Sequence, residues 1–266
     1  METLHDYINI NRELWNEKTG HHLKSDFYDV AGFKEGVTSL QSIETALIGD
    51  VSGKKVLHLQ CHFGQDTLSL ARLGAEVTGI DLSDKAIQSA SELASELNLK
   101  ARFICSDVYA APDVLDETFD MVFTTYGVLG WLPDMQRWAD VVSRFLKPGG
   151  KLILVEFHPV MWMFDNDMTH IQYSYFNKEV IVDSEEGTYA DRNAPMKLTA
   201  VSWNHNLAEV MQALINAGLQ IEQFAEYESS PYNCVANMVT VGEGQYQIKG
   251  LEGKIPLVYS VLATKK

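Results

Sequence analysis

One stretch of the chain, KVLHLQCHFGQDTLSLARLGAEVTGID over residues 55–81, constrains the fold more than any other. Its apolar runs and turn residues predict four elements: a buried strand (56–59), a tight turn around Gly64, a helix (66–72) and a second strand (76–80). The second strand ends in a carboxylate, Asp81. Such a unit brings the backbone N–H groups of a helix N-terminus close to a ligand, with an acid beside them that can accept hydrogen bonds from a ribose. The predicted ligand is therefore nucleotide-like.

The alternation of strands and helices continues through residues 55–157. A helix that starts at Ser83 carries apolar residues on one face, and the apolar runs ARFIC, FDMVFTT and KLILVEF predict three more strands. Pro133 and Asp134 open a further helix that KPGG ends. Short connections of this kind require parallel strands with right-handed crossovers, so we expect a doubly wound α/β sheet.

The alternation breaks after His158 and Pro159 and returns with the helix NLAEVMQALINAG and the strands LQIEQFAEY and PLVYSVLATK. Between them, YSYFNKEVIV alternates well enough to suggest antiparallel strands separated by the turn-like DSEEG, and residues 228–254 are expected to form a loop. Residues 2 to about 30 look helical. The predicted organisation is a helical lid over 1–38, a sheet domain over 39–158 and 204–266, and an inserted cap over 159–203. A helix packed on the domain edge is the alternative for the lid.

Composition narrows the classes of ligand. Asp and Glu outnumber Lys and Arg by 36 to 21, giving a formal net charge of -15. A surface of this charge repels nucleic acids and anionic membranes, so neither is an expected partner. The three cysteines form no CxxC pair, and no run of about 18 apolar residues occurs. These features predict a cytoplasmic protein without disulfides, and they leave its oligomeric state open.

The turn after the first strand is atypical for a dinucleotide site. A GxGxG pattern placed on the end of that strand would fall at positions 60, 62 and 64, where the sequence has Gln60, His62 and Gly64. A pyrophosphate needs close backbone approach at this turn, which Cβ atoms obstruct. A nucleoside without phosphates makes a weaker demand. The turn therefore argues against a nicotinamide cofactor.

Five motifs in order along the chain resemble those of class I S-adenosylmethionine-dependent methyltransferases. They are VLHLQCHFG, VTGIDLS, CSDV, FDMVFTTYGVLGWL and LKPGGKLILVEF, and they cover residues 55–157, with the last helix and two strands extending the match to the C-terminus. The resemblance implies a mostly parallel, seven-stranded Rossmann-like sheet whose last strand is antiparallel, with an inserted antiparallel cap. It also implies S-adenosylmethionine as cofactor and S-adenosylhomocysteine as product.

The resemblance assigns roles by position. The turn would surround the methionine portion, Asp81 would accept from the ribose hydroxyls, Leu82 and Val108 would contact the adenine, and Asp107 would accept from its amino group. Thr125 and Tyr126 would approach the methionine end and the methyl group. The implied cofactor-binding residues are Gln60, Cys61, His62, Gly64, Asp81, Leu82, Asp107, Val108, Thr125 and Tyr126. The acid that the family usually carries two places before its first glycine is His58 here, so the group that binds the cofactor's ammonium is not identified.

Methyl transfer from a sulfonium needs mainly an acceptor held in line with the S–CH3 bond. A base is needed only where the acceptor must lose a proton. His158, at the carboxyl end of the fifth strand, and His62 are candidates for that base, and Tyr126 is a further catalytic candidate. Aromatic residues expected in the acceptor pocket are Trp131, Trp162, Phe164 and Tyr173, which would suit a flat or apolar acceptor, or a cationic amine. No metal site with credible spacing is present in the sequence.

The sequence leaves several alternatives open. Asp81 could merely cap the following helix, Asp107 could be only a turn former, His158 could anchor the turn at Pro159, and the cap aromatics could form a hydrophobic core. At the level of function, a nicotinamide-dependent oxidoreductase and a non-catalytic nucleoside-binding protein of this fold are the alternatives to a methyltransferase acting on a small molecule.

Overall fold

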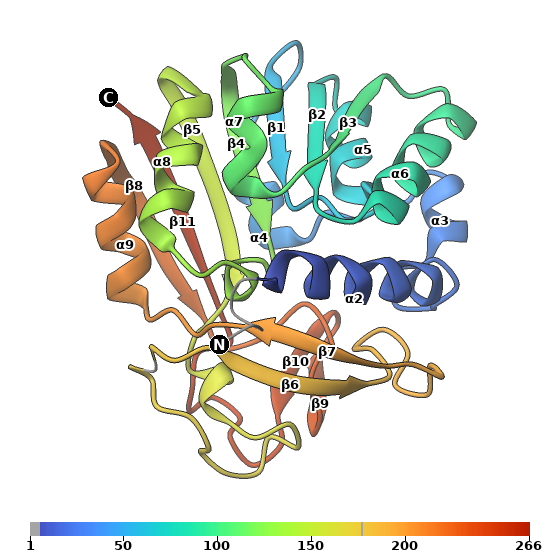
Figure 1. Ribbon diagram of the computed structural model, residues 1–266, viewed down its shortest axis with the longest axis vertical. Helices are drawn as coiled ribbons and strands as arrows, with labels where there is room; N and C mark the ends of the chain where they lie inside the picture. Colours follow the sequence, from blue (N-terminus) through green and yellow to red (C-terminus); the bar gives the residue numbers. More distant parts are fainter. Residues whose placement is uncertain (1–5, 177) are drawn as a thin grey trace.

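A computed structural model describes residues 6–176 and 178–266 of the chain, and its described part contains one seven-stranded sheet. The strand order is β3-β2-β1-β4-β5-β11-β8 (Figure 1). The strands are β1 (Lys55–Leu59), β2 (Glu76–Asp81), β3 (Ala101–Cys105), β4 (Phe119–Thr125), β5 (Leu146–Phe157), β8 (Leu219–Tyr227) and β11 (Val258–Lys265). The last strand, β11, runs antiparallel to both of its neighbours, while the pairs among β1 to β5 are parallel. The predicted fold class is confirmed.

Helices cover both faces of this sheet. The elements are α2 (Tyr7–His22), α3 (Val30–Lys34), α4 (Ser42–Ile48), α5 (Gln65–Arg72), α6 (Asp84–Glu96), α7 (Ala111–Val114), α8 (Met135–Phe145) and α9 (Leu207–Asn216), with short 3-10 turns η1 (Val108–Ala110), η2 (Leu129–Trp131) and η3 (Met161–Met163). One apolar cluster joins α8 and α9 to one face, with Trp138 fully buried in it. A second cluster joins α4 and α5 to the other face. Both faces of the central strands are therefore covered, which explains why those strands read as continuous apolar runs.

The helix starts that the sequence indicates are present. Ser83 accepts a hydrogen bond from the Ala86 N–H at 3.0 Å at the start of α6, and Asp134 accepts one from the Arg137 N–H at 3.0 Å at the start of α8. Both side chains satisfy a backbone donor that the helix itself leaves without a partner. The N-terminal helical prediction is confirmed over Tyr7–His22, whereas positions 1–5 lie outside the described residues.

The region predicted to form a cap, residues 159–203, contains a two-stranded antiparallel sheet, β6 (Ile181–Glu186) and β7 (Lys197–Ser202). The predicted turn DSEEG is wrong, because its first four residues lie in β6 and pair with β7. Turn-type residues are tolerated there because pairing with β7 supplies the backbone hydrogen bonds. The expected loop over 228–254 also contains a hairpin, β9 (Met238–Gly242) with β10 (Gln245–Ile248).

Helix α2 lies between the sheet domain and the cap (Figure 1). Its buried Asn11 donates to the Val201 carbonyl at 2.8 Å and accepts from the Val201 N–H at 3.0 Å. The side chain thereby pairs with the outer edge of β7 as another strand would. On its other side, Arg12 donates to the Leu82 carbonyl at 3.4 Å and Asn16 accepts from the Ser83 hydroxyl at 2.6 Å. No described helix is both long and apolar enough to cross a membrane.

We expect Asn11→Ala to lower the free energy of unfolding by about 2 kcal/mol, because it leaves two buried backbone groups of Val201 without partners. Urea denaturation followed by circular dichroism measures this. Asn9→Ala is the control, since Asn9 is exposed on the same helix and its side chain bonds, among the described residues, to Asp6 and Arg12. Equal urea midpoints for the two variants would show that the Asn11 pair does not hold α2 to the cap.

Candidate active site

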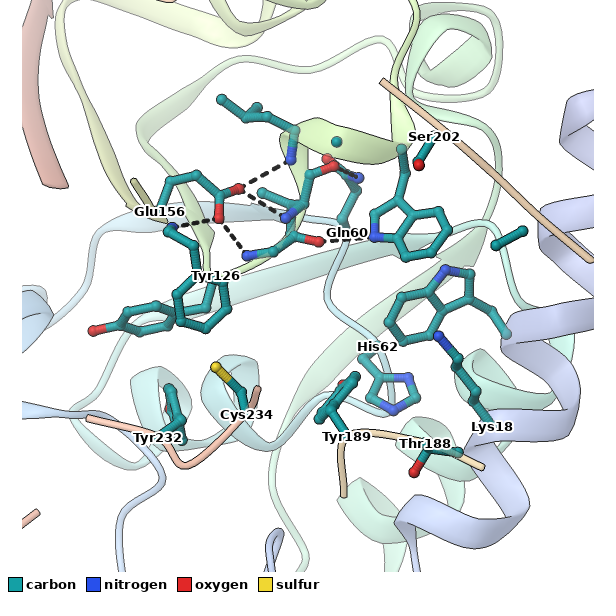
Figure 2. A pocket seen from close by; sticks show the side chains of 18 of the residues that line it. Lys18, Gln60, His62, Tyr126, Glu156, Thr188, Tyr189, Ser202, Tyr232 and Cys234 are labelled. Carbon is teal, nitrogen blue, oxygen red and sulfur yellow. Dashed lines mark hydrogen bonds between the residues drawn. The ribbon is translucent and has the colours of Figure 1, made fainter. Parts of the chain in front are cut away.

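A cavity of about 1190 Å³ lies at the carboxyl ends of β1, β2, β4 and β5, beneath α2 and the cap (Figure 2). Parallel α/β sheets bind their ligands at this edge. Pockets for one drug-sized ligand usually measure about 300 to 1,000 Å³, so this volume leaves room for two molecules. All ten predicted cofactor-binding residues line it, as do the four aromatic residues predicted for the acceptor pocket.

The turn after β1 has the backbone of a glycine loop although it has one glycine. Gln60, His62 and Gly64 all have left-handed backbone angles, with φ of 57°, 50° and 80°. These are the three positions at which a GxGxG pattern would place glycine. A Cβ atom on Gly64 would lie 2.8 Å from the Phe103 ring, which explains why glycine is retained there. A left-handed residue other than glycine costs roughly 1 to 2 kcal/mol, so neighbouring contacts must hold this turn in place.

Asp81 provides one of those contacts. Its carboxylate accepts from the His62 N–H at 2.7 Å and from the Ser83 N–H at 2.9 Å. Burial raises the pKa of Asp81 to about 6, and the backbone donors act in the opposite direction. Asp81 therefore joins the turn to the start of α6. A carboxylate oxygen can accept more than one hydrogen bond, so this arrangement is compatible with ribose hydroxyls as further donors.

Gln60 carries a buried acceptor without a partner. Its Nε2 donates to the Val128 carbonyl at 2.8 Å. This bond fixes the orientation of the amide, so Oε1 points away from Val128. Among the described residues, nothing donates to Oε1. A buried acceptor without a donor is destabilising unless a ligand supplies one. An ammonium group is such a donor, so the turn fits the amino acid portion of S-adenosylmethionine.

Asp107 and Val108 follow β3 and begin η1. The Asp107 carboxylate accepts from the Tyr109 N–H at 2.7 Å and the Ala110 N–H at 3.2 Å, as a turn former does. The side chain also lines the cavity. Tyr7 of α2 lines the same region, and burial, with a smaller effect from the Asp107 charge, raises its pKa to about 12.

Sequence reasoning missed two acids next to the end of β4, the buried Glu44 and the half-buried Asp66. Asp66 accepts from the Thr125 hydroxyl at 3.3 Å, and Glu44 accepts from the Tyr126 hydroxyl at 2.8 Å. Burial, followed by the Asp66 charge, raises the pKa of Glu44 to about 7. Burial also raises the pKa of Asp66. Tyr126 has a left-handed φ of 44°, so these contacts hold a strained residue at the cavity wall.

Glu156, at the end of β5, is a third acid that sequence reasoning missed. Its carboxylate accepts from the backbone N–H groups of Gly127, Val128, Leu129 and Phe157, the bonds to Val128 and Leu129 measuring 2.8 and 3.0 Å (Figure 2). Burial raises the pKa of Glu156, and the same four backbone donors lower it by a smaller amount. Glu156 thereby fixes the loop that carries Trp131, whose indole N–H donates to the Gly127 carbonyl at 2.8 Å. An acid that ends an apolar strand, as in LILVEF, was the available signal.

The side chain of His62 points toward α2. Its Nε2 lies 2.9 Å from Nδ1 of His22, which is fully buried, and the rings of Trp15 and Tyr28 lie 5.3 and 5.6 Å from its own. Burial, the larger cause in both cases, lowers the pKa of His22 to about 2 and that of His62 to about 3. Both imidazoles are therefore neutral at physiological pH. The sequence did not indicate this pair, because 40 positions separate its members.

His158 is not brought to the cavity. Among the described residues that line the cavity it is absent, and its Nε2 lies 2.9 Å from a carboxylate oxygen of Glu226 while Nδ1 accepts from the Val160 N–H at 3.2 Å. It anchors the turn after β5, which was the alternative that the sequence left open. His58, by contrast, lines the cavity, but its ring is buried and its Nδ1 lies 2.8 Å from the Thr67 hydroxyl.

The cap side of the cavity is aromatic. Trp162 and Phe164 follow β5, Tyr173 lies further along the cap, and Trp131 reaches the same wall from η2. No described group of three or more His, Cys, Asp or Glu side chains is arranged to hold a metal ion.

Comparison with known proteins agrees with this geometry. A family model described as a methyltransferase domain matches residues 56–150. The ubiquinone biosynthesis O-methyltransferase of Psychrobacter cryohalolentis is 36% identical over 135 residues, 49% of this chain and 52% of the relative. The demethylmenaquinone methyltransferase of Tropheryma whipplei is 28% identical over 145 residues, 54% and 59% of the two chains. The chain thus spans about half the length of the curated relatives it matches.

Solved structures extend the likeness of fold beyond the matched region. A crystal structure described as a putative S-adenosylmethionine-dependent methyltransferase from Listeria monocytogenes has a TM-score of 0.60 at 19% identity, covering 84% of this chain and 94% of that one. Magnesium protoporphyrin IX methyltransferase from Synechocystis PCC 6803, solved with bound S-adenosylhomocysteine, has a TM-score of 0.55 at 14% identity, covering 98% and 100%. Together with the sheet order, these likenesses show that the chain has the fold of class I S-adenosylmethionine-dependent methyltransferases and that its residues 56–150 match a methyltransferase domain.

Proposed function

We propose that this protein transfers the methyl group of S-adenosylmethionine to a small-molecule acceptor by in-line attack. The observation that carries the proposal is the left-handed turn at Gln60, His62 and Gly64, tied to Asp81 beside a cavity large enough for cofactor and acceptor together. A turn with two side chains in it disfavours a pyrophosphate, which argues against the nicotinamide alternative.

The residues that would hold the cofactor follow from their places along the sheet edge. Asp81 would accept from the ribose hydroxyls, and Leu82, Asp107 and Val108 would surround the adenine. The free Gln60 Oε1 would accept from the ammonium. When bound, S-adenosylmethionine supplies a methyl group already activated by the sulfonium.

The remaining task of the protein is to orient the acceptor and to exclude water. Helix α2 and the cap enclose the cavity, and we propose that residues 1–38 act as a lid and residues 159–203 as the acceptor-binding cap on the sheet domain formed by 39–158 and 204–266. The contacts of Glu156 and Glu44 hold the loop after β4 rigid, which preserves the geometry of attack. A small acceptor fits an enclosed cavity better than a macromolecule does.

Isothermal titration calorimetry with S-adenosylmethionine, S-adenosylhomocysteine and NAD tests the proposal. We expect micromolar or tighter binding of both sulfur nucleosides and no heat with NAD. Binding of NAD without binding of S-adenosylhomocysteine would reject the proposal in favour of an oxidoreductase. Release of S-adenosylhomocysteine when small amines, phenols and carboxylates are supplied would separate an enzyme from a non-catalytic binder.

We expect Asp81→Ala to weaken S-adenosylmethionine binding at least about tenfold, because each hydrogen bond to a charged group contributes roughly 1.5 to 3 kcal/mol. Calorimetry on the folded variant measures the change, with circular dichroism to verify folding. Asp113→Ala is the control, because it removes one exposed carboxylate from α7, outside the cavity. An unchanged affinity in folded Asp81→Ala would make Asp81 only a structural tie between the turn and α6.

The raised pKa of Asp81 gives a pH dependence with a definite sign. Ribose hydroxyls donate to the carboxylate, and the protonated acid accepts less well, so binding weakens as pH falls through about 6. If only the ionised form binds, the dissociation constant rises about tenfold per pH unit below the pKa. Calorimetry between pH 8 and pH 5 measures this slope. Asp81→Asn should remove the slope, and a slope that persists in that variant would assign it to another group.

A further inference from the structure

We propose that the acceptor is an amine and that the protein methylates its nitrogen. This inference rests on the methyl transfer proposed above and adds the chemical class of the acceptor. Three features of the cavity carry it: the inward-facing carboxylates of β6, an ammonium group already held among aromatic rings, and a deficit of free cations in the lining.

Strand β6 places two half-buried carboxylates, Asp183 and Glu185, in the cavity wall. Ile181, Asp183 and Glu185 are half-buried and line the cavity, and the exposed Ser184 and Glu186 also line it. Val182, by contrast, is 51% exposed. A strand that only covers a hydrophobic core would carry apolar residues at these inward positions. The carboxylates are therefore placed toward whatever fills the cap side.

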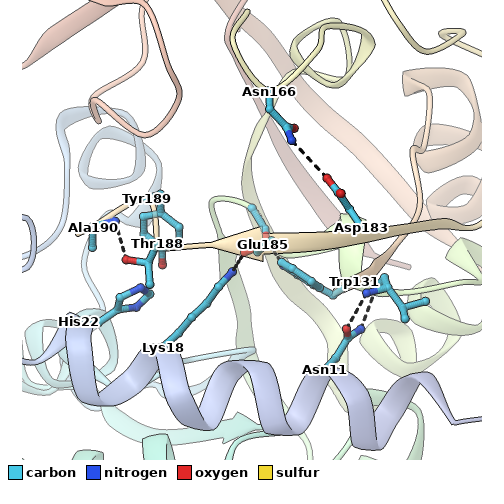
Figure 3. A network of polar contacts seen from close by, with 12 residues as sticks. Asn11, Lys18, His22, Trp131, Asn166, Asp183, Glu185, Thr188, Tyr189 and Ala190 are labelled. Carbon is cyan, nitrogen blue, oxygen red and sulfur yellow. Dashed lines mark hydrogen bonds and ion pairs between the residues drawn. The ribbon is translucent and has the colours of Figure 1, made fainter. Parts of the chain in front are cut away.

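The same wall already holds one ammonium group. Lys18 extends from α2 to β6, where its Nζ lies 2.5 Å from a carboxylate oxygen of Glu185 (Figure 3). It also lies 4.9 Å from the centre of the Trp15 ring and 5.2 Å from that of Trp131. The Lys18 side chain is 3% exposed, so its charge is stabilised by a carboxylate and aromatic faces in place of water. The cavity wall is thus chemically suited to alkylammonium groups.

Free cations are scarce in the lining. Among the described residues that line the cavity, carboxylate side chains outnumber Lys and Arg by ten to two. Lys18 is paired with Glu185, and Arg192 donates to the Val235 carbonyl at 2.6 Å. Asp183 has no ion pair with a described residue and accepts a hydrogen bond from Asn166 at 3.3 Å (Figure 3). A cationic acceptor would find an unneutralised carboxylate here, while an anionic one would be repelled.

The direction in which positive charge moves during methyl transfer also favours an amine acceptor. A neutral amine, having lost its proton to water, uses its lone pair to form the N–C bond while the C–S bond breaks and its electron pair stays on sulfur. The positive charge moves from sulfur to nitrogen, which is toward the cap. Carboxylates and aromatic faces stabilise charge that develops on the acceptor, as with Asp183, Trp162 and Tyr173. A phenolate or carboxylate acceptor would instead have to bring a negative charge beside these acids.

Four probes of similar size test the inference: 2-phenylethylamine, 2-phenylethanol, 4-ethylphenol and 3-phenylpropanoate. We first measure their binding to protein saturated with S-adenosylhomocysteine, by tryptophan fluorescence and calorimetry, and then their turnover with S-adenosylmethionine. We expect the amine to bind at least tenfold more tightly than the alcohol, the phenol or the carboxylate. We also expect it to be the substrate with the highest kcat/KM.

A matched pair of variants locates the effect. Asp183→Asn should weaken amine binding about tenfold while the affinities for the alcohol and for S-adenosylhomocysteine stay unchanged. Glu222→Gln removes an equal charge from an exposed position of β8, away from the cavity, and should change none of them. Because each variant raises the net charge by one unit, a difference between them reports the position of the carboxylate.

The outcomes separate the two proposals. If S-adenosylhomocysteine fails to bind, the methyltransferase proposal fails. If it binds and the phenol or the carboxylate binds or reacts better than the amine, or if the amine shows no preference over the alcohol, the amine inference is overturned and the methyltransferase proposal stands. Equal loss of amine binding in Asp183→Asn and Glu222→Gln would also overturn it.

Discussion

The hydrogen bond from the His62 N–H to the Asp81 carboxylate joins the two strands on which the whole site depends. It ties the turn after β1 to the end of β2, and the second oxygen of the same carboxylate accepts from Ser83 at the start of α6. The turn has left-handed residues at Gln60 and His62, each costing roughly 1 to 2 kcal/mol. Without fixed partners such a turn would relax. The bond to Asp81, and that from Gln60 to the Val128 carbonyl, keep it in the shape of a glycine loop.

A second carboxylate, at the end of β5, fixes a backbone loop in the same way as Asp81 does at the end of β2. Glu156 ends β5 as Asp81 ends β2, and it gathers the backbone N–H groups of the loop after β4. In both places a strand ends in a buried acid whose pKa is raised by burial and opposed by backbone donors. The carboxyl edge of a parallel sheet presents many such donors without partners. The two acids therefore build the two walls between which a cofactor would lie.

The sequence predicted the sheet well because its signals are local. The apolar runs, the caps at Ser83 and Asp134 and the crossover lengths require no knowledge of distant contacts. The cap was predicted less well, since β6 carries the turn-type residues of DSEEG and is a strand only because β7 pairs with it. The site divided in the same way. The residues after β1 to β4 followed from motifs, whereas Glu44, Lys18 and His22 belong to helices whose contacts with the strand ends and the cap form only on folding.

The difference between local and long-range contacts explains why one half of the cavity is easier to predict from the sequence than the other. The proposed cofactor side is built from the ends of strands that follow one another in the chain, so short motifs predict its chemistry. The proposed acceptor side is assembled from α2, η2 and β6, which lie far apart in the chain. No short sequence motif predicts such a surface. Its selectivity for an acceptor depends on the charges and aromatic rings that folding brings together. Lys18 illustrates the point: a lysine of an N-terminal helix is unremarkable in sequence, yet beside Glu185 and two tryptophan rings it marks the cap wall as a place where an ammonium is stable without water.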